Sequence, residues 1–180
     1  PMPLADLLLE IHSPGFDWTI IESGGWTGVK LRRAVAEVMD WPRLFRALGP
    51  DPAIILRSNT NVPDKPELNN LLATWLFTIR QAGFRRIYLE VCNEVNNEGD
   101  WDLPRWLREG PGLVDSWLSL RLTYPGVKLI SPAMRPELPE TAARWHLRRF
   151  AEFDLLGQHT YYQWQTRPED HESWLGQYRP

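Results

Sequence analysis

A carboxylate and an amide stand side by side where an apolar segment of the chain ends. Residues 86–92 read as a buried strand, and Asn93 and Glu94 follow them directly. A carboxyl group in a partly apolar pocket has a raised pKa, so it can hold a proton near neutral pH and act as a general acid or base. The neighbouring amide can hydrogen-bond a substrate hydroxyl. The alternative is a loop glutamate that caps the next helix.

The segments that must position this pair alternate between two hydrophobic patterns. Short runs rich in β-branched and aliphatic residues predict strands. These runs are 17–23, 53–58, 86–92, 127–131 and 154–161. Apolar residues at helical spacing lie between the runs, and a capping box at Asp64 marks the start of one helix. Helices are expected within 4–11, 30–48, 64–82, 113–122 and 140–153.

Strands and helices that alternate in this way are typical of βαβ units with a parallel sheet. An open doubly wound sheet and a (β/α)8 barrel both fit this alternation. No G-x-G-x-x-G pattern follows 17–23, which disfavours a nucleotide-binding sheet. Polar residues gather at the carboxyl ends of the expected strands, where barrels build active sites. These residues are Glu22, Arg57, Asn59, Asn93, Glu94, Ser131, His159 and Tyr161. We therefore expect an α/β fold, a partial (β/α)8 TIM barrel, with 1–180 as a single incomplete domain.

Three segments resemble consecutive strands of the clan A superfamily of retaining glycoside hydrolases, which are (β/α)8 barrels. Glu90-Val-Cys-Asn-Glu-Val-Asn96 is similar to the strand-4 motif E-(aliphatic)-x-N-E-x-N, although Val95 stands where the family usually has proline and Cys92 where it has an aromatic residue. Residues 124–133 resemble the fifth strand, and 154–161 resemble the sixth with its His-x-Tyr pair. The three matches occur in the family's order.

The resemblance implies hydrolysis of O-glycosidic bonds with retention of configuration. Glu94 would be the general acid/base, and Asn93 would bind the sugar 2-hydroxyl. His159 and Tyr161 would line the subsite where cleavage occurs. The substrate implied is a carbohydrate.

Arg57 has two interpretations. The superfamily often has an arginine at the end of strand 2, beside the nucleophile, and Arg57 is therefore a candidate substrate-binding residue. If 17–23 is strand 2, however, Arg57 ends strand 3. An ion pair with Glu22 or Glu90 is the alternative.

Sugar-binding sites often use flat aromatic side chains, and this chain contains 10 tryptophans. Trp26, in the loop after 17–23, and Trp164 are candidate platforms for a sugar ring, with core packing as the alternative. Trp101 and Trp106 flank the same expected rim. Glu22, at the end of the first expected strand, joins the substrate-binding candidates.

The second carboxylate that a retaining glycosidase requires has no counterpart in the expected strands. The two carboxyl groups of such enzymes lie about 5–5.5 Å apart, and the family carries its nucleophile glutamate on strand 7. Counted from Glu94 on strand 4, the chain covers strands 2 to 6, so the nucleophile is expected beyond residue 180. We therefore expect a fragment that is inactive alone, with unpaired sheet edges that could associate with a partner.

Two other functions remain open: a non-catalytic glycan-binding barrel fragment or pseudoenzyme, and an unrelated α/β enzyme that uses the same rim. The net charge of −3 disfavours nucleic acid as a partner. Four scattered histidines and a single cysteine predict neither a metal site nor another cofactor. No apolar run is long enough to predict a membrane-spanning helix. The compartment is left open, because no signal peptide is visible in the sequence.

Overall fold

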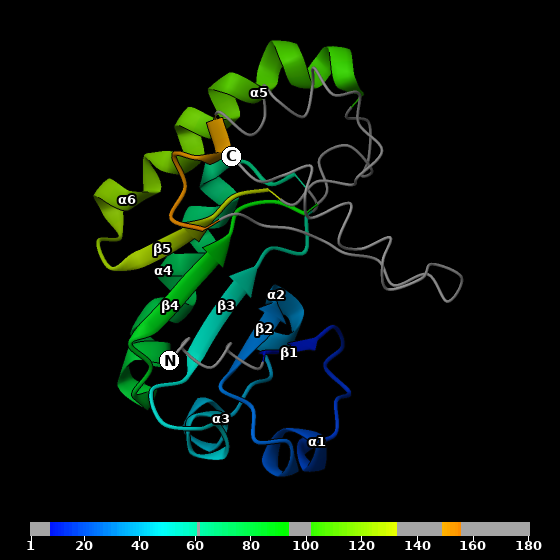
Figure 1. Ribbon diagram of the computed structural model, residues 1–180, viewed down its shortest axis with the longest axis vertical. Helices are drawn as coiled ribbons and strands as arrows, with labels where there is room; N and C mark the ends of the chain where they lie inside the picture. The colour runs from blue at the N-terminus through cyan, green and yellow to red at the C-terminus, as the bar shows by residue number, and fades with distance from the viewer. Residues whose placement is uncertain (1–7, 61, 94–101, 133–148, 156–180) are drawn as a thin grey trace, which may run out of the picture.

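The computed structural model describes residues 8–60, 62–93, 102–132 and 149–155, which form a parallel sheet with helices (Figure 1). Its five strands follow one another in the order β1-β2-β3-β4-β5, and all neighbours are parallel. The strands are β1 (Leu8–Ile11), β2 (Gly28–Arg32), β3 (Ala53–Arg57), β4 (Arg86–Glu90) and β5 (Val127–Ile130). The helices are α1 (Trp18–Ser23), α2 (Arg33–Ala36), α3 (Trp41–Ala47), α4 (Lys65–Ala82), α5 (Leu103–Leu118) and α6 (Leu120–Thr123). The predicted α/β class is confirmed.

One face of the sheet forms the hydrophobic core together with the helices. Alternate strand residues point to this face, as the two-residue repeat of a strand requires. They are Leu9, Ile11, Val29, Leu31, Ile54, Leu56, Ile87, Leu89, Val127 and Leu129. Leu68, Leu72 and Ile79 of α4 are fully buried in the same core. Burial of these side chains is the main stabilising contribution to the sheet.

Helix α4 begins and ends where the sequence predicts. The Asp64 carboxylate accepts a hydrogen bond from the backbone N–H of Glu67 at 2.8 Å, and a proline occupies the first turn. Gly83 follows the last turn with φ +117°, a left-handed conformation that suits glycine. These caps satisfy backbone groups that a helix leaves without partners at its two ends.

Two expected elements at the start of the chain are wrong. Residues 17–23 were expected as a strand but form helix α1, because the Asp17 carboxylate caps it by accepting from the Thr19 backbone N–H at 2.8 Å. Hydrogen bonds from Thr19 lower the pKa of Asp17, chiefly the one from its hydroxyl and then this one from its backbone N–H. Residues 4–11 were expected as a helix, but Leu8–Ile11 is the edge strand β1. Local capping outweighed the β-branched composition of α1, and sheet pairing outweighed the apolar helical pattern of β1.

The strand β2 has no counterpart among the expected elements. It lies in a region that the sequence analysis divided between a loop and a helix, and only the later part of 30–48 is helical, as α2 and α3. The first position of β2 requires glycine, because a Cβ at Gly28 would lie 2.6 Å from the backbone oxygen of Ala53. Three strands thus precede β4, rather than the two that were expected.

A sixth strand position follows β5. Leu155 pairs in parallel with Ile130, and its carbonyl accepts from the Ser131 backbone N–H at 2.9 Å. The rest of the strand expected at 154–161 lies outside the described residues, as does most of the helix expected at 140–153. In the part of the chain that is described, no helix is both long and apolar enough to cross a membrane.

Replacing Trp117 is expected to destabilise the fold strongly. This side chain of α5 is fully buried, and its indole N–H donates to the Pro63 carbonyl at 2.9 Å. Trp117→Ala should lower the free energy of unfolding by about 3–5 kcal/mol. Trp117→Phe should cost less, about 1–3 kcal/mol, because phenylalanine keeps much of the apolar packing. Its remaining cost comes from the Pro63 carbonyl, which loses its hydrogen bond. Urea titration checks both values, and equal losses in the two variants would contradict this account.

Candidate functional site at the carboxyl ends of the strands

The face of the sheet opposite the core, called the inner face here, carries the charged side chains of the strands. The register places its residues in three rows across the sheet. The row nearest the amino ends is Leu8, Gly28, Ala53 and Arg86. The middle row is Glu10, Lys30, Ile55, Tyr88 and Lys128. The row nearest the carboxyl ends is Arg32, Arg57, Glu90 and Ile130. Ionisable residues therefore concentrate in the middle row and at the carboxyl ends.

Four strands, β1 to β4, are linked across the inner face by ion pairs. Lys30 Nζ lies 2.6 Å from Glu90 Oε2 and 3.4 Å from Glu10 Oε1. Arg57 Nη1 lies 3.8 Å from the same Glu10 oxygen. Glu90 and Arg57 are each only 4% exposed. Charges this buried are expensive to desolvate unless they are paired, so these contacts offset the cost of burying Glu90 and Arg57.

Several polar side chains at the carboxyl ends have a buried atom without a hydrogen-bond partner among the described residues. They include Arg32 Nε, Arg57 Nε and Asn93 Oδ1, and Asn93 is 5% exposed. Asn93 follows β4 closely, and Glu90 of β4 is the register neighbour of Arg57. A buried donor or acceptor without a partner destabilises a fold. Arg57 therefore offers a donor, and Asn93 an acceptor, that a bound molecule could satisfy.

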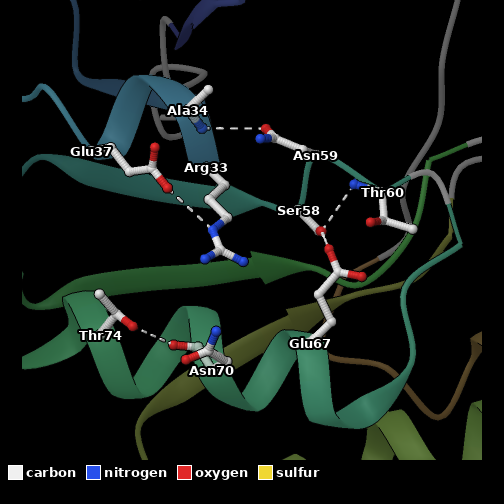
Figure 2. A network of polar contacts seen from close by, with 9 residues as sticks. All are labelled: Arg33, Ala34, Glu37, Ser58, Asn59, Thr60, Glu67, Asn70 and Thr74. Atoms are coloured by element: carbon white, nitrogen blue, oxygen red, sulfur yellow. Dashed lines mark hydrogen bonds and ion pairs between the residues drawn. The ribbon is translucent and has the colours of Figure 1, made fainter.

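The loop after β3 is anchored by its own polar contacts (Figure 2). The buried Ser58 hydroxyl donates to the Glu67 carboxylate of α4 and accepts from the Thr60 backbone N–H at 3.1 Å. Asn59 Oδ1 accepts from the backbone N–H of Ala34 at 3.2 Å, in the first turn of α2. These contacts tie the loop to both neighbouring helices and so hold the end of β3, where Arg57 lies.

Glu22 and Trp26 do not belong to this end of the sheet. Both were expected at the rim, but Glu22 lies on α1, where its carboxylate accepts from Arg43 Nε at 2.7 Å. Trp26 lies just before β2, and its indole N–H donates to the Ile20 carbonyl at 2.9 Å. Figure 1 shows α1 beside α3 at the amino ends of the strands. The expectation failed because 17–23 is a helix that brings the chain back to the start of β2.

The other predicted residues fall into two groups. Asn93 and Arg57 lie at the carboxyl ends on adjacent strands, and the acidic partner of Arg57 is Glu10 rather than Glu22. Trp106 is buried in the core, 6.3 Å from Trp117 between ring centroids, so packing is its role. The remaining predicted residues lie outside the described residues: Glu94, Trp101, His159, Tyr161 and Trp164.

Sequence reasoning missed Glu10, Lys30 and Arg32. A signal was present for the last two, because Val29-Lys30-Leu31-Arg32 alternates apolar and charged residues after a glycine, as a strand does. Glu10 lies within the misassigned helix, where its pairing could not be foreseen. In the described part of the chain, no cluster of three or more potential metal ligands occurs.

The class of protein that the fold defines is an α/β protein with part of a (β/α)8 barrel. The structure is similar to that of AbfB, a family 51 α-L-arabinofuranosidase from Bifidobacterium longum, with a TM-score of 0.60 and 14% sequence identity. The match covers 98% of this chain and 52% of AbfB, so the chain spans about half the length of that enzyme. No protein-family model matches the sequence, and no curated protein matches it either. At this identity the likeness shows the fold.

Proposed function

We propose that this chain is part of a retaining glycoside hydrolase, with Glu94 as general acid/base. The observation that carries the proposal is the buried, unpartnered Asn93 Oδ1 at the carboxyl end of the fourth strand. The resemblance assigns this amide to a sugar hydroxyl, and a hydroxyl would supply the hydrogen bond that the oxygen lacks. Glu94 is the next residue in the chain. The likeness to an arabinofuranosidase fold supports the same reading.

The strand count of the structure differs from the expected one, and it changes which arginine could lie beside the nucleophile. With β1 as the first strand, Arg32 ends the second strand. This is the position at which the superfamily often carries an arginine beside its nucleophile. Arg57 then ends the third strand and binds substrate through its free Nε donor. His159, Tyr161 and Trp164 complete the proposed sugar site, and the nucleophile is supplied by residues after Pro180.

Glu94 would work by proton transfer. Its carboxyl group donates a proton to the departing glycosidic oxygen while the nucleophile attacks the anomeric carbon. The carboxylate then removes a proton from the water that hydrolyses the glycosyl intermediate. The charges of Lys30 and Glu90 are already paired before a substrate binds, which favours a preorganised site.

The test for the proposed contact compares a glycoside with its 2-deoxy analogue. In the longest polypeptide that carries this sequence, Asn93→Ala should lower kcat/KM for the normal glycoside by about 10- to 100-fold, the worth of a buried hydrogen bond. The 2-deoxy analogue should lose little, because it lacks the hydroxyl. Asn70→Ala, on the exposed side of α4, is the matched control. Equal losses for both substrates would remove Asn93 from the sugar site.

The second candidate is a glycan-binding module without catalytic activity. The unpartnered Arg57 Nε and Asn93 Oδ1 could bind a glycan, and no nucleophile is expected within this chain. Calorimetry of the 180-residue chain with a panel of oligosaccharides separates the two. Binding without turnover, in the chain and in the longer polypeptide alike, would establish the module and reject the hydrolase.

A further inference from the structure

The inner face carries more cations than carboxylates. Among the residues of β1 to β5, five cationic side chains and two carboxylates lie on it, whereas the whole chain has a net charge of −3. The cations are Lys30, Arg32, Arg57, Arg86 and Lys128, and the carboxylates are Glu10 and Glu90. The interior of a (β/α)8 barrel is usually filled by branched aliphatic side chains. A cationic interior therefore favours an anionic ligand.

Arg57 is the most buried cation of the inner face among the described residues, and its pairing is incomplete. Its contact with Glu10 is 3.8 Å long, and that carboxylate is 37% exposed and also 3.4 Å from Lys30. Charge-assisted hydrogen bonds between guanidinium and carboxylate are typically about 2.7–2.9 Å long, and often bidentate. Arg57 is nevertheless 4% exposed, and within the described residues its Nε has no partner. A carboxylate brought in by a ligand would complete its pairing.

Asn93 specifies the second feature of the ligand. Its buried Oδ1 is an acceptor and so requires a donor, whereas Arg57 requires an acceptor. A sugar with a carboxylate on one carbon and hydroxyls on the others provides both. Adding the carboxyl groups of Glu94 and of a nucleophile still leaves the five cations of β1 to β5 in excess, against four carboxyl groups.

We propose that the inner face binds a glycoside of a uronic acid, with its carboxylate on Arg57 and a hydroxyl on Asn93 Oδ1. This inference rests on the proposed function, which identifies the ligand as a glycoside. The new part is that the sugar carries a negative charge. The excess positive charge also attracts such a ligand over distances of about a Debye length, roughly 10 Å at 0.1 M salt.

Matched pairs of methyl glycosides test the proposal by calorimetry on the full chain. The pairs are methyl glucuronide with methyl glucoside and methyl galacturonide with methyl galactoside. In at least one pair the uronide should bind about 10-fold or more tightly than its neutral partner, which corresponds to about one charge-assisted hydrogen bond. The difference should shrink at about 0.5 M salt, where surface charges are screened.

Arg57→Lys provides the sharper variant, because it keeps the charge but loses the planar fork. Uronide affinity should fall by about 10-fold and neutral-sugar affinity should change little. Arg57→Met should abolish the preference, and the milder lysine variant covers the case in which the methionine variant does not fold. Arg46→Gln, an exposed residue of α3, is the control and should leave both affinities unchanged.

The outcomes separate this inference from the hydrolase proposal. Neutral sugars that bind as tightly as uronides, or are turned over in their place, overturn the uronide preference while the hydrolase stands. A uronide preference that depends on Arg57, with turnover that is indifferent to Glu94, supports the inference and removes the hydrolase. If neither member of either pair binds, the inference is overturned, and hydrolysis assays alone decide the hydrolase.

Discussion

Replacing Glu94 with glutamine is expected to lower kcat for an alkyl glycoside by about 100- to 10,000-fold, the usual contribution of a general acid or base. Glutamine has nearly the same shape but cannot donate a proton to the departing oxygen. The measurement is steady-state hydrolysis by the longest polypeptide that carries this sequence. The basic limb of the pH profile should also disappear, because that limb reports ionisation of the acid.

The leaving group provides an internal control for Glu94. The dinitrophenolate of a dinitrophenyl glycoside leaves without being protonated. The first step of hydrolysis, in which this group leaves, should therefore be nearly unaffected in Glu94→Gln. A variant that is only misfolded would lose activity on both substrates. Glu37→Gln, whose carboxylate pairs with Arg33 on the surface at 3.3 Å, should behave as the wild type. Unchanged hydrolysis of the alkyl glycoside by Glu94→Gln would contradict the proposed role.

Replacing Lys30 with methionine is expected to produce the largest loss of stability among the site residues. Lys30 Nζ contacts Glu90 at 2.6 Å, and the Glu90 side chain is 5% exposed. Removing one partner of a buried pair leaves a buried charge and typically costs about 3–5 kcal/mol. Arg57, the register neighbour of Glu90, should hold the loss near the lower end of that range. Urea titration at neutral pH gives the value, and Lys65→Met at the start of α4 is the control.

The pH dependence of that loss follows from its cause. Without Lys30, burial should raise the pKa of Glu90 above that of the unfolded chain. Above the raised pKa, the folded protein holds a carboxylate that is costly to bury. As the pH falls through it, the folded state binds a proton more readily than the unfolded state does, and the deficit relative to wild type shrinks. A double variant Lys30→Met with Glu90→Gln should recover most of the stability at neutral pH. No recovery would show that the pair is not the source of the loss.

Parts of the fold with a strong local signal could be predicted from the sequence. The strand Arg86–Glu90 has an apolar centre of residues that favour strands. Helix α4 has a capping residue, Asp64, at its start and a glycine, Gly83, at its end. The start of the chain could not be predicted in this way. Residues 18–21 are aromatic and β-branched, but the Asp17 cap decides for a helix. Strand β1 is short and lies at the edge, and its pairing with β2 depends on contacts distant in sequence.

The candidate site was predictable to the extent that its residues directly follow a recognisable strand. Asn93 and Arg57 were found for that reason, and both lie at the carboxyl ends. Glu22 and Trp26 were misplaced because a wrong element type reverses the direction of the chain. Lys30 and Glu10 become visible only through the register, which brings residues 20 positions apart side by side.

A crystal structure with an oligosaccharide bound to the Glu94→Gln variant tests the central claim most directly. We predict a sugar on the inner face, with one hydroxyl on Asn93 Oδ1, an acceptor group on Arg57 Nε, and the glycosidic oxygen beside residue 94. A sugar bound on the helical side of the sheet, or a residue 94 side chain directed away from the inner face, would contradict the account.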